Sequence, residues 1–324
     1  MKILVTGGAG YIGSFMVKRL LKDSHDVVVI DSLERGHKEA VDSKASLKVG
    51  NLFDENFLHQ TLSADKFDAI IHFAGYISME ESMRLPEMYF NNNTFATLKL
   101  LEKAKEFSIN KFIFSSTAGV YGNPTTIPIP ESHPKNPQNP YGESKLMVEN
   151  ILKWFQKIHG INYAALRYFN ACGAALDGTM GENHNPETHI IPKAIEAALK
   201  NKPFSLFGND YKTKDGTCVR DYIHVIDLVE AHVLALQKLN SAPGAYCYNV
   251  GTGNGFSNKE IVETVKQISG VDFKIEAKER RPGDTDELVA DNTKITKELN
   301  FAANHSDLQT IISTAWQWHK NSKI

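Results

Sequence analysis

The chain has 324 residues, of which 42% are hydrophobic and 23% are charged, and its formal net charge at pH 7 is -2. This composition is typical of a globular protein with a large core and two lobes, and it excludes a strongly basic surface for nucleic acid or an anionic membrane. No apolar run approaches the roughly 20 residues that cross a bilayer. Three cysteines without paired spacing, and a glycine too early for a signal peptide, lead us to expect a cytoplasmic protein.

The chain begins with a predicted buried strand over residues 2–6, followed by three glycines and a predicted amphipathic helix over residues 14–21. Gly7, Gly10 and Gly13 allow a tight turn and a close approach of the backbone to a pyrophosphate, which the helix N-terminus would bind. Their spacing is G-x-x-G-x-x-G rather than the common G-x-G-x-x-G. A purely structural turn explains such a triplet equally well.

A second predicted strand, residues 27–30, ends in Asp31, about 20 residues beyond the glycines. A carboxylate at this place accepts a hydrogen bond from a ribose 2′-hydroxyl and repels a 2′-phosphate, so the pattern favours NAD over NADP. Arg35 is close enough in the sequence to leave the preference for NAD over NADP open. A turn or a helix cap is the alternative role for Asp31.

Further strands are predicted over residues 47–49, 68–73 and 111–116, with helical segments between them, notably over residues 86–107. Alternating strands and helices predict an α/β fold with a doubly wound parallel sheet, in which ligands bind at the carboxyl ends of the strands. The residues expected at these ends are Asn51, Phe73, Gly75 and Thr117.

The segment that follows carries the pattern of an acid–base site. Pro140 suits the first turn of a helix, and Tyr141 and Lys145 are four residues apart, so they share one helix face. A lysine ammonium beside a phenol favours the phenolate, which could act as a base. An ordinary pair on a solvated helix face is the alternative, because such pairs are common.

In this order, the glycine triplet, Asp31, the strand ends and Tyr141-x-x-x-Lys145 resemble the extended short-chain dehydrogenase/reductase family. The chain is similar over essentially its whole length to the UDP-glucose 4-epimerases of that family. The further segments that carry the resemblance are His72-Phe73-Ala74-Gly75, Phe114-Ser115-Ser116, Val120-Tyr121-Gly122, Tyr168-Phe169-Asn170, residues 207–211 and residues 216–224.

This resemblance implies a Rossmann domain over residues 1–170 that holds NAD tightly, and a smaller mixed α/β UDP-sugar-binding lobe over residues 171–324, interleaved with the last strands of the sheet. The implied cofactor-binding residues are Gly7, Gly10, Tyr11, Ile12, Gly13, Asp31, Asn51, Leu52, Phe73, Ala74, Gly75, Asn92, Tyr141, Lys145 and Phe169. Where the family shows an Asp–Ile or similar pair, this chain has Asn51-Leu52, and the asparagine can still bond adenine.

For the chemistry, the resemblance implies interconversion of UDP-galactose and UDP-glucose through a transient 4-keto sugar and enzyme-bound NADH. Tyr141 would be the base, Thr117 its hydroxyl partner, and Lys145 would lower the pKa of Tyr141. Related dehydratases carry an Asp-Glu pair directly after the equivalent of Thr117, but here Ala118-Gly119 cannot transfer protons. This favours epimerisation without elimination, and it also weakens the reading as a UDP-glucuronate decarboxylase.

In the second lobe, residues 173–188 are expected to form a loop. His184 and His189 lie in or next to it, and because no third ligand is evident we expect no metal site. Helices are predicted over residues 190–200, 224–239 and 308–318, and a strand over 246–250. By resemblance, the substrate-binding residues are Thr117, Asn170, His189, Ile190, Ser205, Leu206, Phe207, Arg220, Arg281, Asp284 and Leu288, with the two arginines at the diphosphate.

Two questions stay open at this point. The substrate could be another UDP-sugar, such as a UDP-N-acetylhexosamine, a UDP-pentose or a UDP-uronic acid. A non-catalytic NAD-sensing regulator could share the fold, although such regulators often lose the tyrosine–lysine pair that this chain keeps. The resemblance also implies a homodimer formed through the helices of residues 86–107 and 141–159.

Overall fold

The computed structural model describes residues 1–281 and 284–322, which form two compact units. Unit 1 consists of Met1–Gly122, Pro134–Arg167 and Val229–Tyr248, and unit 2 of Asn123–His133, Tyr168–Leu228 and Asn249–Ile324. The chain leaves unit 1 for residues 123–133, leaves it again after Arg167 in the sixth strand, and returns to it for residues 229–248. Pro282 and Gly283, which lie between the expected substrate-binding residues Arg281 and Asp284, are outside the described residues.

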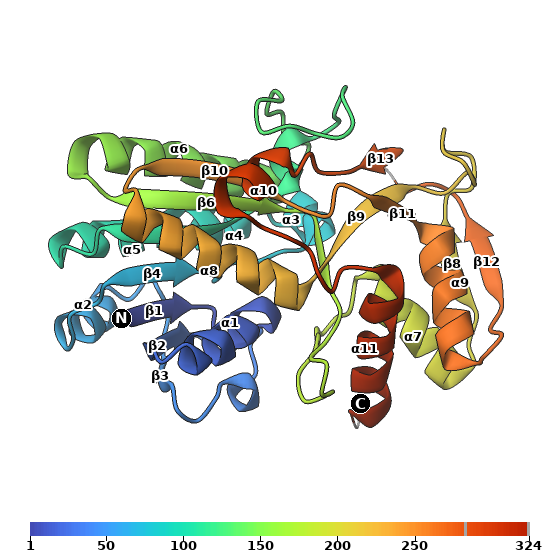
Figure 1. Ribbon diagram of the computed structural model, residues 1–324, viewed down its shortest axis with the longest axis horizontal. Coiled ribbons are helices and arrows are strands. Elements are labelled where there is room, and N and C mark those ends of the chain that lie inside the picture. The colour runs from blue at the N-terminus through green and yellow to red at the C-terminus, as the bar shows by residue number, and fades with distance from the viewer. Residues whose placement is uncertain (282–283, 323–324) are drawn as a thin grey trace. The chain divides into compact units, whose positions relative to one another are not determined.

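Unit 1 is built on a seven-stranded sheet with the order β10-β6-β5-β4-β1-β2-β3. Figure 1 shows β1, β2 and β3 side by side at one end and β6 next to β10 at the other. The strands β3, β2, β1, β4 and β5 pair in parallel, as the alternation of strands and helices predicted. The strands are β1 (Lys2–Thr6), β2 (Asp26–Asp31), β3 (Ser46–Val49), β4 (Ala69–His72), β5 (Lys111–Thr117), β6 (Asn162–Tyr168) and β10 (Ala245–Val250).

Helices cover the sheet of unit 1 on both faces. Leu4 of β1 packs in a core cluster with residues of α2, α5 and α6, whereas its neighbours Ile3 and Val5, which point to the other face, are fully buried as well. On that other face, Arg19 of α1 forms an ion pair with Glu230 of α8. The helices are α1 (Tyr11–Lys22), α2 (Glu55–Ser63), α3 (Met79–Arg84), α4 (Pro86–Tyr89), α5 (Ala96–Glu106), α6 (Pro140–His159) and α8 (Val225–Ser241), with short 3₁₀ turns at Lys38–Ala40 and Ala118–Tyr121.

The helical segment predicted over residues 86–107 is not one regular helix. A π-helical stretch, Phe90–Phe95, separates α4 from α5. Such stretches displace side chains from the regular spacing and are frequent at functional sites. Here the stretch contains Asn92 and Asn93, and the side chain of Asn93 is buried and bonded to the backbone of Tyr76.

Unit 2 contains two small sheets and a helical core. In the first sheet β9 lies between β11 and β13 and also pairs with β7, and in the second β8 pairs in parallel with β12. The core is formed by apolar residues of α7, α9 and α11 together with those of β8. The elements are β7 (Asn170–Cys172), α7 (Ile190–Lys200), β8 (Phe204–Phe207), β9 (Val219–His224), β11 (Gly255–Ser257), α9 (Asn258–Ser269), β12 (Ile275–Lys278), β13 (Glu287–Leu288), α10 (Thr293–Leu299) and α11 (Leu308–Asn321).

The expected helix over residues 190–200 and the loop over 173–188 are confirmed. The helix expected from residue 224 begins one residue later, because His224 is the last residue of β9. Within the described ranges, none of the helices combines the length and the apolar character that a membrane crossing requires.

Candidate active site

The turn between β1 and α1 requires glycine at two positions. Gly7 has a φ of +74°, and a Cβ there would lie 2.5 Å from the backbone nitrogen of Ala74. A Cβ on Gly13 would lie 2.1 Å from the carbonyl oxygen of Gly7. Helix α1 begins directly after Gly10, and no side chain caps its first turn. The turn therefore presents bare backbone and helix N–H groups, which is the arrangement that binds a pyrophosphate.

Asp31 lies beside this turn, at the carboxyl end of β2. One carboxylate oxygen accepts a hydrogen bond from the backbone N–H of Ala9 at 3.0 Å, and the other accepts one from Leu33 at 2.9 Å. These bonds fix the carboxylate next to the glycine turn, where it can accept from ribose hydroxyls. Arg35, which could have favoured a 2′-phosphate, instead pairs with Glu81 at 2.9 Å and stacks over the ring of Tyr76.

The other expected cofactor residues of unit 1 follow β3 or β4, open α1 or lie in the π-helical stretch. Asn51 and Leu52 come after β3, Phe73 to Gly75 come after β4, and Tyr11 and Ile12 open α1. Asn92 donates to the side chain of Asn93 at 3.2 Å. Phe169, expected in the same set, belongs to unit 2.

Asn93 itself was not expected from the sequence. Its side chain accepts from the N–H of Tyr76 at 2.8 Å and donates to the carbonyl oxygen of the same residue at 3.0 Å. It also donates to the hydroxyl of Ser144 on α6 at 3.2 Å. Asn93 thus holds the segment after β4 against the helix that carries Tyr141 and Lys145.

Helix α6 is fixed at both ends by local sequence signals. The Asn139 side chain accepts from the N–H of Gly142 at 2.9 Å, Pro140 stands at the first helical position, and Gly160 ends the helix with a left-handed conformation. Tyr141 and Lys145 therefore lie in the first two turns of a well-capped helix.

Tyr141, Lys145 and Thr117 come together at the end of β5. The hydroxyl of Thr117 forms a hydrogen bond with Tyr141. Lys145 is buried, donates to the carbonyl oxygen of Ser115 at 3.0 Å, and reaches the segment after β4, where a Cβ on Gly75 would lie 3.3 Å from its ammonium nitrogen. A phenol, a hydroxyl and an amine are thus held at the carboxyl ends of β4 and β5, next to the glycine turn.

The pKa values in this group depend on burial. Burial raises the pKa of Tyr141, and the hydrogen bond from Thr117 only partly opposes this effect. Burial also lowers the pKa of Lys145 to about 8, because the charged ammonium loses solvation. The expected lowering of the pKa of Tyr141 by Lys145 stays a prediction.

A buried polar network that the sequence analysis missed lies behind these residues. Glu149 of α6 and Arg167 of β6 form a bidentate ion pair, with nitrogen–oxygen distances of 2.8 and 2.5 Å, and each side chain is only 3% exposed. Ser116 donates to Glu149 at 2.7 Å, and Arg167 donates to the hydroxyl of Tyr121 at 2.8 Å. The available signal was the spacing of Glu149, four residues after Lys145 on the same helix face.

Unit 2 contains a groove with a volume of about 410 Å³. Many of the expected substrate residues line it: Ile190, Ser205, Leu206, Phe207, Arg281 and Asp284. Residues that the sequence analysis did not single out, including Thr188, Lys193, Lys202 and Asn258, complete the lining. The guanidinium of Arg281 lies 4.2 Å from the centre of the Phe207 ring. The groove thus offers an aromatic surface and several cations, as a nucleotide diphosphate requires.

The remaining expected substrate residues of unit 2 make other contacts. Asn170 donates to the carbonyl oxygen of Asp221 at 2.9 Å. Arg220 donates to the carbonyl oxygen of Thr285 at 2.9 Å and lies 3.6 Å from the carboxylate of Asp284. Leu288 is half-buried on β13, opposite Arg220 in the register of the two strands.

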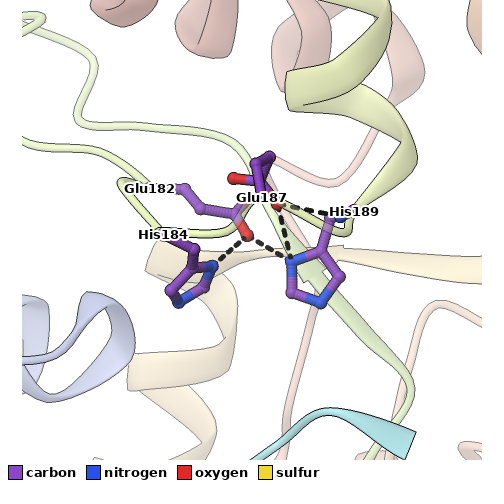
Figure 2. A group of neighbouring side chains, drawn as sticks. All are labelled: Glu182, His184, Glu187 and His189. Carbon is purple, nitrogen blue, oxygen red and sulfur yellow. Dashed lines mark hydrogen bonds and ion pairs between the residues drawn. The ribbon is translucent and has the colours of Figure 1, made fainter. Parts of the chain in front are cut away.

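Four side chains just before and at the start of α7 also gather in one place, and we call them the Glu–His cluster: Glu182, His184, Glu187 and His189 (Figure 2). Burial alone would lower the pKa of His189, but Glu182 raises it to about 9. Although burial opposes this, the two histidines lower the pKa of Glu182 to about 2. The cluster corrects the expectation that no third ligand lies near the histidines.

Comparison with known proteins shows the family to which the chain belongs. The model of the family described as "NAD dependent epimerase/dehydratase family" matches residues 3–251. The chain is 45% identical over 322 residues to a UDP-glucose 4-epimerase of Lactobacillus helveticus, covering 99% of this chain and 98% of that protein.

Two solved structures are similar throughout. One is a UDP-glucose 4-epimerase from Brucella ovis in complex with NAD, with 42% identity, a TM-score of 0.94 and 97% of each chain covered. The other is a UDP-Glc/GlcNAc 4-epimerase from Campylobacter jejuni, with 42% identity, a TM-score of 0.87 and 99% of each chain covered.

Proposed function

Because this chain belongs to the NAD-dependent epimerase/dehydratase family, we propose that it is an NAD-dependent UDP-glucose 4-epimerase that interconverts UDP-galactose and UDP-glucose. The observation that carries the proposal is the placement of Tyr141, Thr117 and Lys145 next to a glycine turn and Asp31. Purified protein given UDP-galactose, with no other reductant or oxidant, should form UDP-glucose.

The residues of unit 1 fit NAD. Gly7 and Gly13, where a Cβ would collide with backbone, have no side chain to block a pyrophosphate from the turn. The carboxylate of Asp31 is oriented beside this turn. When bound, NAD supplies the oxidant that accepts a hydride from C4 of the sugar and later returns it.

The side chains then carry the proton transfer. Tyr141, as phenolate, removes the proton from the 4-hydroxyl, and Thr117 bonds to the same oxygen and orients it. Because burial raises the pKa of Tyr141, the phenolate needs positive charge near it. We propose that Lys145, one helical turn further along α6 and bonded to the carbonyl oxygen of Ser115, supplies that charge. Tyr141 would return the proton to the 4-oxygen after the keto sugar has turned, so that its reduction on the opposite face would give the epimer.

The residues after Thr117 argue for epimerisation rather than dehydration. Ala118 and Gly119 occupy a short 3₁₀ turn, Ala118–Tyr121, directly after β5. Neither residue can give or take a proton, so this segment supplies no second acid and base for an elimination. The keto sugar is therefore expected to be reduced again rather than dehydrated.

Asp31 gives a prediction about the choice of cofactor. Because its carboxylate faces the glycine turn, a 2′-phosphate there would cost several kcal/mol, and we expect NADP to bind at least about 100-fold more weakly than NAD. Asp31→Asn should lower the ratio of the NADP dissociation constant to the NAD dissociation constant about tenfold or more, as measured by titrating apoprotein with each cofactor.

The matched control is Asp26→Asn at the other end of β2, where the carboxylate pairs with Lys2 at 3.1 Å. It should leave the preference unchanged. Equal binding of NAD and NADP by the unaltered protein would show that Asp31 does not face the ribose.

For the substrate, we propose that the groove of unit 2 binds the UDP moiety. The ring of Phe207 and the strand β8 offer a flat surface for uracil, while Arg281, Lys193 and Lys202 can pair with the diphosphate. Asp284, which also lines the groove, can accept from a ribose hydroxyl.

Leu288 gives a prediction about substrate breadth. By resemblance it stands near the C2 substituent of the sugar, where a large aromatic residue excludes an N-acetyl group. Leucine is intermediate in size, so we expect good turnover of UDP-glucose and UDP-galactose and weak to moderate turnover of N-acetylated sugars. Leu288→Tyr should suppress turnover of UDP-N-acetylgalactosamine and spare UDP-galactose, as measured by kcat/KM for each.

The competing role for Leu288 is simple packing, because its side chain is half-buried. Val289→Phe supplies the control, since Val289 is buried and overpacking there should lower both activities together with the melting temperature. If Leu288→Tyr behaved in the same way, Leu288 would be a packing residue and not part of the sugar pocket.

We also propose that the protein is a homodimer through α6 and the helices of residues 86–107. We propose that it resides in the cytoplasm, where its three cysteines would stay reduced. Large apolar side chains are exposed there: Trp154 is 60% and Ile158 is 64% exposed, one helical turn apart, and Phe95 is 49% exposed. Trp154→Glu should convert the dimer to monomer in sedimentation velocity, while Lys22→Glu on α1 should not. A monomeric unaltered protein would contradict the proposal.

A further inference from the structure

The Glu–His cluster brings four metal-ligating groups together. One ligand atom from each of its four residues can be chosen such that all lie within 4.8 Å of one another. Figure 2 shows the side chains turned toward a common point, with the carboxylate of Glu182 between the two imidazoles. The distance from Glu182 to the Nδ1 of His184 is 3.0 Å, and His189 contacts the same oxygen.

The chain holds these groups in place with contacts beyond those among their four side chains. Glu182 is only 4% exposed, its carbonyl oxygen accepts from the indole N–H of Trp318 on α11 at 3.0 Å, and Gly181 packs against the same indole ring. The carboxylate of Glu187 accepts from the N–H groups of Thr188 and His189, at 2.7 and 2.8 Å. The ligand positions therefore depend on the fold and not on a chance encounter of exposed side chains.

The donor set matches a first-row divalent ion. Two imidazole nitrogens and two carboxylate oxygens suit Zn²⁺ and its neighbours, and two carboxylates balance the charge of the ion. In a tetrahedral zinc site, ligand atoms are roughly 3.4 Å apart, given bond lengths of about 2.0–2.2 Å. The atoms of the cluster need only small side-chain movements to reach that spacing.

We propose that the Glu–His cluster is a structural binding site for a divalent transition metal ion, with zinc as the representative ion. Four protein ligands would close the coordination sphere, which is the arrangement of structural rather than catalytic zinc. The ion would tie the loop before α7 to the start of that helix. Thr188 and Ile190, which flank His189 in the sequence, line the groove of unit 2, so the ion would also stiffen one wall of it.

The alternative occupant is a proton. With one proton on His189, the cluster is an ion pair with the buried Glu182 and needs no metal. The two occupants differ in their dependence on His184 and Glu187, because four ligands are needed to hold a metal, whereas the ion pair needs only two residues.

The experiment uses the full-length protein with any affinity tag removed, stripped with a chelator and titrated with Zn²⁺ against a chromophoric competitor. We expect one equivalent bound per chain, with the affinity lowered at least about tenfold in both His184→Ala and Glu187→Gln. The control is His59→Ala, which removes a histidine that also lies beside a single glutamate, Glu106, at 3.4 Å, and it should bind Zn²⁺ as the unaltered protein does.

A second readout needs no variant. Co²⁺ added to the stripped protein should give the intense visible d–d bands of a tetrahedral site, and Zn²⁺ should abolish them. No bound zinc and no such bands, or equal zinc affinity in all variants, would overturn the proposal and leave the cluster as a protonated ion pair. Circular dichroism of each variant separates loss of a ligand from loss of the fold.

Discussion

Replacing Tyr141 with phenylalanine should lower kcat by about 10²–10⁴-fold or more, the range typical for removal of an acid–base group. The substitution removes one oxygen atom, which bonds to Thr117 and which in the proposed mechanism takes the proton from the sugar hydroxyl. The ring stays, and so does its packing against Tyr89. NAD and UDP-sugar should therefore still bind, and the loss should lie in kcat rather than in KM.

The measurement is steady-state turnover of UDP-galactose together with a binding titration of UDP. Tyr246→Phe is the matched control, since it removes a phenol oxygen that donates to the carbonyl oxygen of Ala242, at 2.8 Å. It should leave turnover close to normal. A Tyr141→Phe enzyme that turned over as fast as this control would remove Tyr141 from the mechanism.

Arg167→Met should destabilise the protein by about 3–5 kcal/mol, the usual cost of removing one partner of a buried ion pair. The change leaves the carboxylate of Glu149 buried at 3% exposure without its bidentate partner, and it also removes the donor to Tyr121. Because Glu149 lies one turn beyond Lys145 and bonds to Ser116, the disturbance should reach the segment that carries Thr117. Chemical and thermal unfolding curves measure the loss.

Two further variants make this test specific. Arg19→Met breaks an ion pair with Glu230 whose side chains are 30% and 37% exposed, and it should cost about 1 kcal/mol or less. Replacing Glu149 and Arg167 together, with leucine and methionine, should recover much of the stability, because no buried charge is left alone. Equal losses for Arg167→Met and Arg19→Met would contradict the buried network.

The parts of the fold that could be predicted are those written in local sequence. The strand Lys2–Thr6, the glycine turn after it and the helix Ile190–Lys200 follow from apolar spacing, glycine placement and short-range periodicity. The start of helix α6 could be predicted because Pro140 suits the first turn of a helix, whereas the Asn139 cap and the end at Gly160 were found only in the structure.

The parts that could not be predicted depend on contacts distant in sequence. Arg167 of β6 forms an ion pair with Glu149 of α6, and the residues around Arg167 in the sequence do not indicate this pair. The sequence of residues 86–107 is compatible with one regular helix, so the π-helical stretch could not be predicted. Asn93, which lies in this stretch, bonds to Tyr76, a residue distant in sequence. The burial that raises the pKa of Tyr141 could not be predicted either, because a sequence shows the neighbouring lysine but not the desolvation of the phenol.

The most direct test of the proposed function is a single incubation. Purified protein that carries NAD is given UDP-galactose with no added coenzyme, reductant or oxidant, and the nucleotide sugars are separated by anion-exchange chromatography. The proposed function predicts conversion to a mixture of UDP-glucose and UDP-galactose that is also reached from UDP-glucose, with no net loss of NAD. Absence of conversion from both directions, by protein shown to hold NAD, would contradict it.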